Sequence, residues 1–553
     1  MSKEFQEMSL NNEHQGEATA GFSEQVEANQ KALASKPKFQ CDFIVCGSGS
    51  SGSVVARRLA ENANVHVLLL EAGGRDDLPS VTDPNQWRTI IGSDLDWKFQ
   101  TQPERALNGR ILPYSMGKIL GGGSGINVSM WARGHKTDWD FFAQEAGDPD
   151  WNYESVLGLY RRIEDWHGKP DSRHRGTGGP VYVAPSSGLD STSESVSSPI
   201  VPAFLEAAAS SGISTFESPN GALMEDQAGA AITDFTVRNG NRQSIFRSYT
   251  YPLMAQTNLT VLTGALVTKI NFLGKRATGV EFTYQGRNCR ADASLETVLC
   301  TGAIQTPKLL MQSGVGDEAE LKRFGIPVVQ NLAGVGKNLQ DHAASGLVWQ
   351  APSTLPRKSD LAQAVAFWNS NSELQSPDTY AVLIEGPRPA VGDDAPLLWV
   401  IAPTILQPKS RGQVSLTGSQ PSDSVRIEAN FLTHPDDMLA LSEMAKLCRE
   451  IGNSAMTSAY VDRELTPPEV TQDVGMENYL RNSARTIWHQ TGTCKMGQDA
   501  MSVVDGQLRV YGIEKLRIAD GSIMPRVTTG NTMAPCVVIG ERASDLIKAA
   551  YHL

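Results

Sequence analysis

The feature that most constrains this chain is a short apolar, strand-like run that leads straight into three spaced glycines. Residues 41–46 are mostly apolar, and the motif Gly-x-Gly-x-x-Gly follows without a break. A helical stretch comes next and leads to a second apolar run, Val65–Leu70. Apolar strands without alternation are typical of parallel sheets that are buried on both faces. Residues 41–71 therefore predict one β–α–β unit of an α/β fold.

Each glycine of the motif has a separate physical task. Gly47 permits the tight turn, Gly49 lets the backbone approach a pyrophosphate, and Gly52 allows the helix to pack closely on the strand. The helix begins at Ser50 and Ser51, whose position at its N-terminus supplies backbone amides for an anion. The motif thus predicts a phosphate-binding turn.

Glu71 stands at the end of the second apolar run, where a unit of this kind binds ribose. A carboxylate there can accept hydrogen bonds from both ribose hydroxyls of an adenosine. With strand, helix, second strand and acid all in register, the segment predicts dinucleotide binding. The acid disfavours a 2′-phosphate, and it leaves NAD and FAD both open.

Two later segments repeat the strand-to-helix character of this unit. Thr297–Cys300 leads through Gly302 into a helix, and Leu516–Ala519 leads into Asp520 and Gly521. If these strands share a sheet with the first unit, the nucleotide-binding domain is discontinuous. We therefore predict a disordered tail over 1–38, a Rossmann-type FAD-binding domain over 39–345 and 485–553, and an inserted substrate domain with a mixed or antiparallel sheet over 346–484.

Composition narrows the class of protein further. The 553 residues carry 61 acidic and 49 basic side chains, and this balance disfavours a nucleic-acid partner. We find no apolar run long enough to span a membrane. The seven scattered cysteines show no metal-like spacing and favour reduced thiols and a cytoplasmic location. The Pro/Ser/Gly-rich stretch 169–200 predicts a long surface excursion, and the oligomeric state stays open.

A second glycine-rich segment has an unusual mixture of residues. Residues 117–134 hold six glycines, interleaved with large apolar side chains such as Ile126, Met130 and Trp131. A solvated, flexible linker would avoid those side chains. A backbone with so few side chains suits close packing against a flat ring system.

These motifs together resemble the glucose–methanol–choline (GMC) family of flavin oxidoreductases. The resemblance runs from Phe43 to the C-terminal helix. Five ordered segments carry it: 117–140, 302–316, 334–342, 489–497 and 520–535. Because five motifs match in order, the signal is far more specific than any one of them.

The resemblance implies FAD, with its isoalloxazine ring packed by the glycine-rich segment. Asn127 would lie near the reactive N5/C4a edge of the flavin, and Val267 near the adenine. Ile126 occupies the place of the histidine that some members attach covalently, so we expect non-covalent FAD. Beyond the β–α–β unit, the expected FAD-binding residues are Gly117, Gly121, Gly122, Ser124, Asn127, Val128, Val267, Gly302, Trp488, Asp520, Gly521, Asn531 and Thr532.

The resemblance also implies the catalytic pair, His489 and Asn531. A neutral imidazole can accept the hydroxyl proton of an alcohol, and an amide N–H can orient its oxygen. Trp488 has two open interpretations: core packing, or an aromatic wall that favours benzylic, furanic or allylic alcohols. His342 is interpreted as a structural loop residue rather than a second base.

The predicted activity is oxidation of a primary alcohol to the aldehyde, by hydride transfer to flavin N5. The partners are a small-molecule alcohol and either dioxygen or another electron acceptor. Two alternatives stay open. One is a FAD-containing lyase of the same fold, of the hydroxynitrile lyase or fatty-acid photodecarboxylase type. The other is a non-catalytic protein that binds flavin or NAD.

Overall fold

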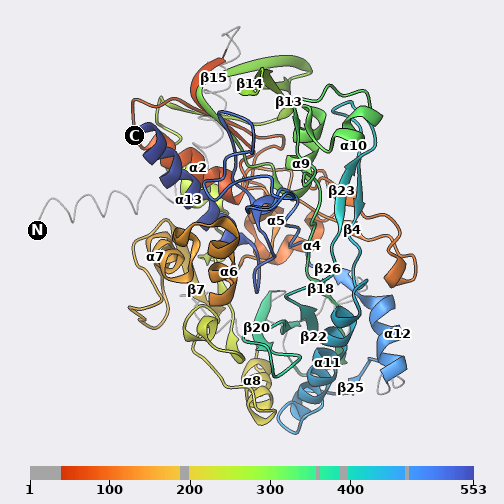
Figure 1. Cartoon of the computed structure of the whole chain (residues 1–553). Helices are drawn as coiled ribbons and strands as arrows, with labels where there is room; N and C mark the ends of the chain where they lie inside the picture. Colours follow the sequence, from red (N-terminus) through yellow and green to blue (C-terminus); the bar gives the residue numbers. More distant parts are fainter. Residues whose placement is uncertain (1–38, 187–197, 356–360, 386–396, 468–472) are drawn as a thin grey trace, which may run out of the picture.

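A computed structural model describes residues 39–186, 198–355, 361–385, 397–467 and 473–553. The predicted tail, 1–38, lies outside the described residues. Figure 1 shows two β-rich regions at opposite ends of the molecule, one around β13–β15 and one around β20 and β22. The short helix α5 (Gly123–Ile126) lies between them.

The first region is a seven-stranded sheet that gathers strands from most of the chain. Its order is β12-β2-β1-β15-β14-β13, and β27 pairs with β15. Parallel pairing joins β12 to β2, β2 to β1, β1 to β15 and β15 to β27. On its other part β15 pairs with β14, and β14 with β13, in an antiparallel meander. The prediction that strands from the start, the middle and the end of the sequence share one sheet is confirmed. The bounds are β1 Phe39–Cys46, β2 Val67–Leu70, β12 Leu259–Leu262, β13 Ala265–Leu273, β14 Arg276–Tyr284, β15 Arg287–Leu299 and β27 Leu516–Ile518.

Three helices flank this sheet and bring their N-termini to the site described below. They are α2 (Ser50–Ala60), α9 (Gly302–Gln312) and α13 (Met533–Tyr551). The chain's last helix, α13, packs on α2. This contact is close because Gly540 has no side chain: a Cβ there would lie 2.8 Å from the carbonyl oxygen of Ser51.

The second region is an eight-stranded antiparallel sheet. Its order is β25-β19-β22-β21-β20-β8, and β18 pairs with both β22 and β26. The bounds are β8 Gly229–Ile232, β18 Ala343–Ala344, β19 Leu347–Gln350, β20 Ala362–Trp368, β21 Thr379–Glu385, β22 Leu398–Ile405, β25 Arg463–Glu464 and β26 Arg485–Thr486. A substrate-side antiparallel sheet agrees with the predicted fold class. The domain boundaries at 346 and 484 stay a prediction, and β8 reaches this sheet from before them.

The two faces of this sheet have different neighbours. Helix α11 (Pro435–Gly452) contacts β21 and β22, and Ala381 and Leu383 belong to the apolar cluster on its side. Tyr380 and Val382 alternate with them and belong to a separate apolar cluster on the other face. The period of two in a strand thus divides β21 between the core and the site.

A smaller four-stranded sheet, β5-β9-β7-β6, lies beside the glycine-rich segment. It rests on buried charges: Arg133 pairs with Glu164, and Arg175 pairs with both Glu164 and Asp234. The prediction of a surface excursion over 169–200 agrees with exposed residues such as Lys169 and Arg173, but it is wrong for Arg175 and strand β7, which are part of the interior. The bounds are β5 Met130–Trp131, β6 Glu164–Trp166, β7 Val181–Pro185 and β9 Asp234–Phe235, with helices α6 Lys136–Ala146, α7 Tyr153–Ile163, α8 Ile200–Ser210, α10 Glu318–Arg323 and α12 Asp473–Ser483 elsewhere.

Candidate active site

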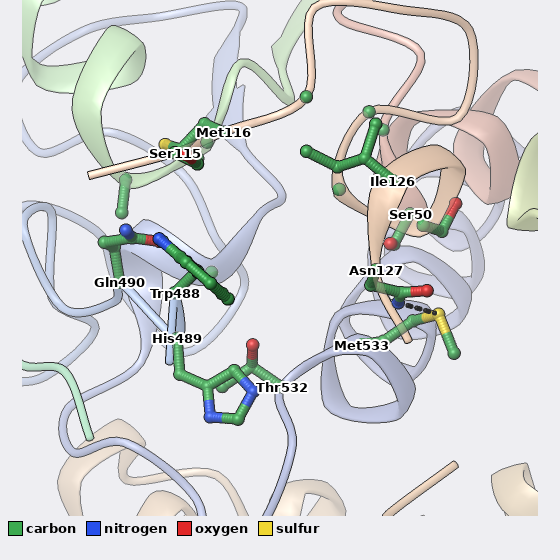
Figure 2. A pocket seen from close by; sticks show the side chains of 18 of the residues that line it. Ser50, Ser115, Met116, Ile126, Asn127, Trp488, His489, Gln490, Thr532 and Met533 are labelled. Atoms are coloured by element: carbon green, nitrogen blue, oxygen red, sulfur yellow. Dashed lines mark hydrogen bonds between the residues drawn. The ribbon is translucent and has the colours of Figure 1, made fainter. Parts of the chain in front are cut away.

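A cavity of about 650 Å³ lies between the two large sheets. Its lining includes the first β–α–β unit, the glycine-rich segment, the N-terminus of α13 and the inner face of the eight-stranded sheet. Figure 2 shows Asn127 and Ser50 on one side of it and Trp488 and His489 on the other. Segments far apart in the sequence thus meet at one site.

The N-terminus of α2 is built to receive an anion. Within the described residues, no side chain caps this helix at Gly49, and its first turn carries no acid. The amides at its start are therefore available to a ligand, and the helix dipole favours negative charge there. Around the Cβ direction of Gly49 no atom lies within 4 Å, so a ligand can approach the backbone. These features fit the pyrophosphate of a dinucleotide.

Glu71 is held at the nucleotide end of the cavity. Ser48 donates to its Oε2 through the backbone N–H at 2.9 Å and the hydroxyl at 2.7 Å, and Gly73 N–H donates to its Oε1 at 2.7 Å. Burial raises the pKa of Glu71, against the opposing effect of those bonds. Oε1, which accepts only the Gly73 N–H among these bonds, keeps a further lone pair for a ribose hydroxyl.

The two glycine turns touch each other. A Cβ on Gly122, whose φ is +52°, would lie 2.8 Å from the Cα of Gly49. The backbones thus form a cradle that larger residues would close. In this cradle Asn127, which is predicted to lie near the flavin edge, accepts the Ser129 N–H at 2.9 Å and donates from Nδ2 to the Met533 sulfur at 3.1 Å (Figure 2).

Sequence reasoning missed the buried cation behind this cradle. Arg242 is 2% exposed and donates to the carbonyl and side-chain oxygens of Asn127, to Ser129 and to the Val81 carbonyl. Burial lowers the pKa of Arg242 to about 10. A lone arginine between polar residues gives no sequence signal for this contact, because folding brings the two positions together.

On the opposite side, His489 lies against a second histidine. Its Nδ1 is 2.8 Å from Nδ1 of His342, and its Nε2 is 3.2 Å from Nδ2 of Asn531. His342 Nε2 lies 3.1 Å from the carbonyl oxygen of Leu406. The structure therefore places His342 in direct contact with the predicted base, a contact that its interpretation as a loop residue does not include.

These contacts determine which ring nitrogens of His342 and His489 carry a hydrogen. A carbonyl only accepts, so His342 carries its hydrogen on Nε2 and leaves Nδ1 bare. Burial lowers the pKa of His342 to about 4, so it is neutral at pH 7. His489 must then donate from Nδ1, so its Nε2 carries no hydrogen and accepts from Nδ2 of Asn531. Burial and the neighbouring His342 hold the pKa of His489 well below its usual value, so it too is neutral.

Asp341 anchors both histidine-bearing segments. Its Oδ1 accepts the backbone N–H groups of His342 and His489, each at 2.8 Å, and its Oδ2 accepts the Thr486 hydroxyl at 2.5 Å. Burial raises the pKa of Asp341 to about 6. The backbone before His489 is also unusual, since Trp488 has a left-handed φ of 63°. Its ring meets Trp87 edge to face at 6.0 Å between centroids.

All but two of the predicted site residues line this cavity. Gly52 and Gly121 lie behind its wall: a Cβ on Gly52 would be 1.9 Å from the Gly47 carbonyl oxygen, and one on Gly121 would be 3.1 Å from Ser244. The predicted residues in the lining are Gly47, Gly49, Ser50, Ser51, Glu71, Gly117, Gly122, Ser124, Asn127, Val128, Val267, Gly302, Trp488, His489, Asp520, Gly521, Asn531 and Thr532.

A dinucleotide-binding cradle opposite a buried, neutral imidazole is the arrangement expected of an oxidoreductase that uses a nucleotide cofactor. Two family models described as GMC oxidoreductase match residues 41–344 and 408–540. The chain belongs to the GMC oxidoreductase family, its cofactor is FAD, and it acts on the CH–OH group of a donor. Within the described residues no helix combines the length and apolar character that a bilayer crossing requires.

Individual relatives match over almost their whole length. An oxygen-dependent choline dehydrogenase of Brucella anthropi is 34% identical over 540 residues, which cover 92% of this chain and 95% of that protein. An alcohol dehydrogenase (acceptor) of Pseudomonas putida is 34% identical over 541 residues, with the same coverage. Among solved structures, pyridoxine 4-oxidase from Mesorbium loti superposes with a TM-score of 0.85 at 28% identity, over 93% of this chain and 99% of that one.

Proposed function

We propose that this protein oxidises a primary alcohol to the aldehyde, with His489 as the base and Asn531 as the donor to the substrate oxygen. His489 carries the proposal, because it lines the cavity across from Asn127 and Ser50 and its Nε2 carries no hydrogen. A neutral imidazole in that place can take a hydroxyl proton at physiological pH. Its geometry therefore suits removal of a proton from an alcohol bound between the two sides.

The roles divide as follows. Bound FAD supplies the acceptor for the hydride that leaves the alcohol carbon. His489 Nε2 takes the hydroxyl proton, and the Nδ1–H of His489 keeps its bond to His342 throughout. The amide of Asn531 carries two N–H groups, so it can donate to the substrate oxygen as negative charge develops there.

The cradle residues would hold the cofactor without a covalent bond. The amides at the start of α2 suit the pyrophosphate, Glu71 suits the ribose, and Asn127 suits the flavin edge. Ile126, which precedes Asn127, offers no atom for covalent attachment. Dioxygen or another electron acceptor would then complete the turnover.

Arylmethanols and related primary alcohols are the proposed substrates. Trp87 and Trp488 both line the cavity, and their edge-to-face contact makes an aromatic wall next to His489. A flat ring can stack on such a wall while its hydroxymethyl group reaches Nε2. The similarity to pyridoxine 4-oxidase, whose name refers to a hydroxymethylated aromatic ring, supports this substrate class.

Replacing the base tests the proposal directly. His489→Ala should bind FAD normally and should slow anaerobic bleaching of the flavin absorbance by benzyl alcohol at least about 100-fold, because the proton acceptor is lost. His66→Ala, at a histidine whose side chain is 66% exposed, is the control and should bleach at the wild-type rate. Undiminished bleaching in His489→Ala would refute the proposal, and no bleaching in the wild-type protein would favour a lyase.

A further inference from the structure

We propose that this enzyme selects uncharged alcohols and rejects those that carry a quaternary ammonium group. The inference rests on the proposed function and concerns the part of the cavity beyond the flavin, which we call the substrate chamber. Six residues of the strands β20, β21 and β22 form its wall: Ala362, Tyr380, Val382, Ile384, Ala402 and Thr404.

The wall of the substrate chamber is a continuous, mostly apolar surface. In the sheet, Tyr380 is paired with Thr404, and Val382 is paired with Ala402, so that their side chains stand next to each other. Thr404 is the small polar exception, and its hydroxyl donates to the Ala402 carbonyl at 3.3 Å. A cation that binds against this apolar wall loses the water around it and gains no charged contacts in exchange.

Among the described residues, no carboxylate side chain lines this part of the cavity. Of the described residues that line the cavity, Glu71 and Asp520 are the acids. Glu71 lies at the end of β2 in the other sheet, and Asp520 accepts hydrogen bonds from Gly302 and Thr306 beside the predicted pyrophosphate site. Neither is a counter-charge for a group bound against β21 and β22.

The charges nearer the substrate chamber have the wrong sign for an ammonium group. Arg88 and Arg485 both line the cavity, and Arg485 belongs to β26 of the same sheet. A cation bound against that sheet would share the cavity with two guanidinium groups. A buried cation without a compensating anion is strongly disfavoured.

Two of the aromatic rings that line the cavity already have a partner on one face. A cation–π contact needs a free ring face. The guanidinium of Arg88 already lies over the Trp87 ring, 4.4 Å from its centroid. One face of Tyr380 is stacked on Phe367, with 5.4 Å between centroids. The substrate chamber therefore offers apolar contact to a neutral group and little to a charged one, although relatives of this chain are named for choline.

Two alcohols of the same shape separate charge from size. Choline and 3,3-dimethylbutan-1-ol differ in one atom, nitrogen against carbon, and choline keeps its charge at every pH. Anaerobic flavin reduction in the wild-type holoenzyme should give a kcat/KM at least about 100-fold higher for the neutral alcohol. A kcat/KM for choline within tenfold of that value, or above it, would overturn the inference.

A pair of variants tests the cause. Val382→Glu places a carboxylate in the wall, and it should narrow the preference at least about tenfold relative to the matched Val382→Gln variant. Equal preferences in two folded variants would contradict the electrostatic explanation. If no alcohol bleaches the flavin, the proposed function fails separately. The thermal shift of the wild-type holoenzyme with each alcohol then decides the charge question: a larger shift with choline overturns it.

Discussion

At the scale of single side chains, the protonation of His489 is set by groups that never touch a substrate. The Leu406 carbonyl holds the hydrogen of His342 on Nε2, and the bare Nδ1 of His342 then holds the hydrogen of His489 on Nδ1. His342 is thus a positioning residue in the proposed mechanism. It takes the part that a carboxylate has in many catalytic triads, without adding a negative charge.

Variants of His342 should separate this role from simple packing. His342→Leu removes the acceptor, so we expect kcat for flavin reduction to fall about 10- to 100-fold. His342→Asn keeps an oxygen that can accept from His489 Nδ1–H, so it should recover part of the rate. Equal rates in His342→Leu and the wild type would contradict the role.

The pH profile gives an independent readout of the same pair. Because the pKa of His489 is held well below 6.5, its neutral form persists as the pH falls. The wild-type rate of flavin reduction should therefore stay level from pH 8 through 6.5 and decline only at lower pH. In His342→Leu the neighbouring imidazole that helps to lower this pKa is gone, so the decline should move to higher pH.

Sequence motifs identified His489 and Asn531 as candidates, and both line the cavity. The contacts of His342 and Arg242 could not be predicted. His342 meets His489 across 147 residues of sequence, and Arg242 meets Asn127 across 115. Neither residue type is unusual where it stands, so only the folded chain reveals what each one contacts.

At the scale of elements, the glycine motif combines a position open to a ligand with one required for packing. Gly49→Ala should fold, because no atom lies within 4 Å of the new Cβ and φ is −63°. It should weaken FAD binding, since the methyl group occupies the approach to the backbone. Gly52→Ala should instead prevent folding, because its Cβ would be 1.9 Å from the Gly47 carbonyl oxygen. Soluble yield and flavin absorbance of the purified proteins check both outcomes, and a yellow Gly49→Ala protein would contradict this account.

Four strand segments of the first sheet, in β1, β2, the end of β15 and β27, were predictable because their mostly apolar runs are short and soon followed by glycine. The second sheet was predictable in kind but not in membership. Strand β8 lies far earlier in the chain than its partner β20, and its sequence, Gly-Ala-Ala-Ile, has no strong strand propensity. Whether such a segment forms a strand depends on its pairing with a distant part of the chain. The burial of Arg175 likewise depends on distant residues, because its buried ion-pair partners hold a polar stretch of sequence in the interior.

At the scale of the whole molecule, the cavity takes its walls from two sheets that meet around the cofactor site. Removing FAD should therefore lower the thermal midpoint, and adding it back should raise the midpoint by an amount that grows with concentration. At 100 times the dissociation constant the gain is about 2.7 kcal/mol. Riboflavin, which lacks the adenosine and pyrophosphate, is the matched control and should give a much smaller shift. Equal shifts would contradict a binding site that depends on α2 and Glu71.

The division of β21 between two neighbours also bears on how this enzyme could diversify. Every second side chain packs on the side of α11, while Tyr380 and Val382 between them line the cavity and pack in a separate apolar cluster. Substitutions at those intermediate positions therefore change the lining of the cavity while they leave the packing against α11 in place. The choice of substrate can in this way evolve separately from the contact between the sheet and its helix.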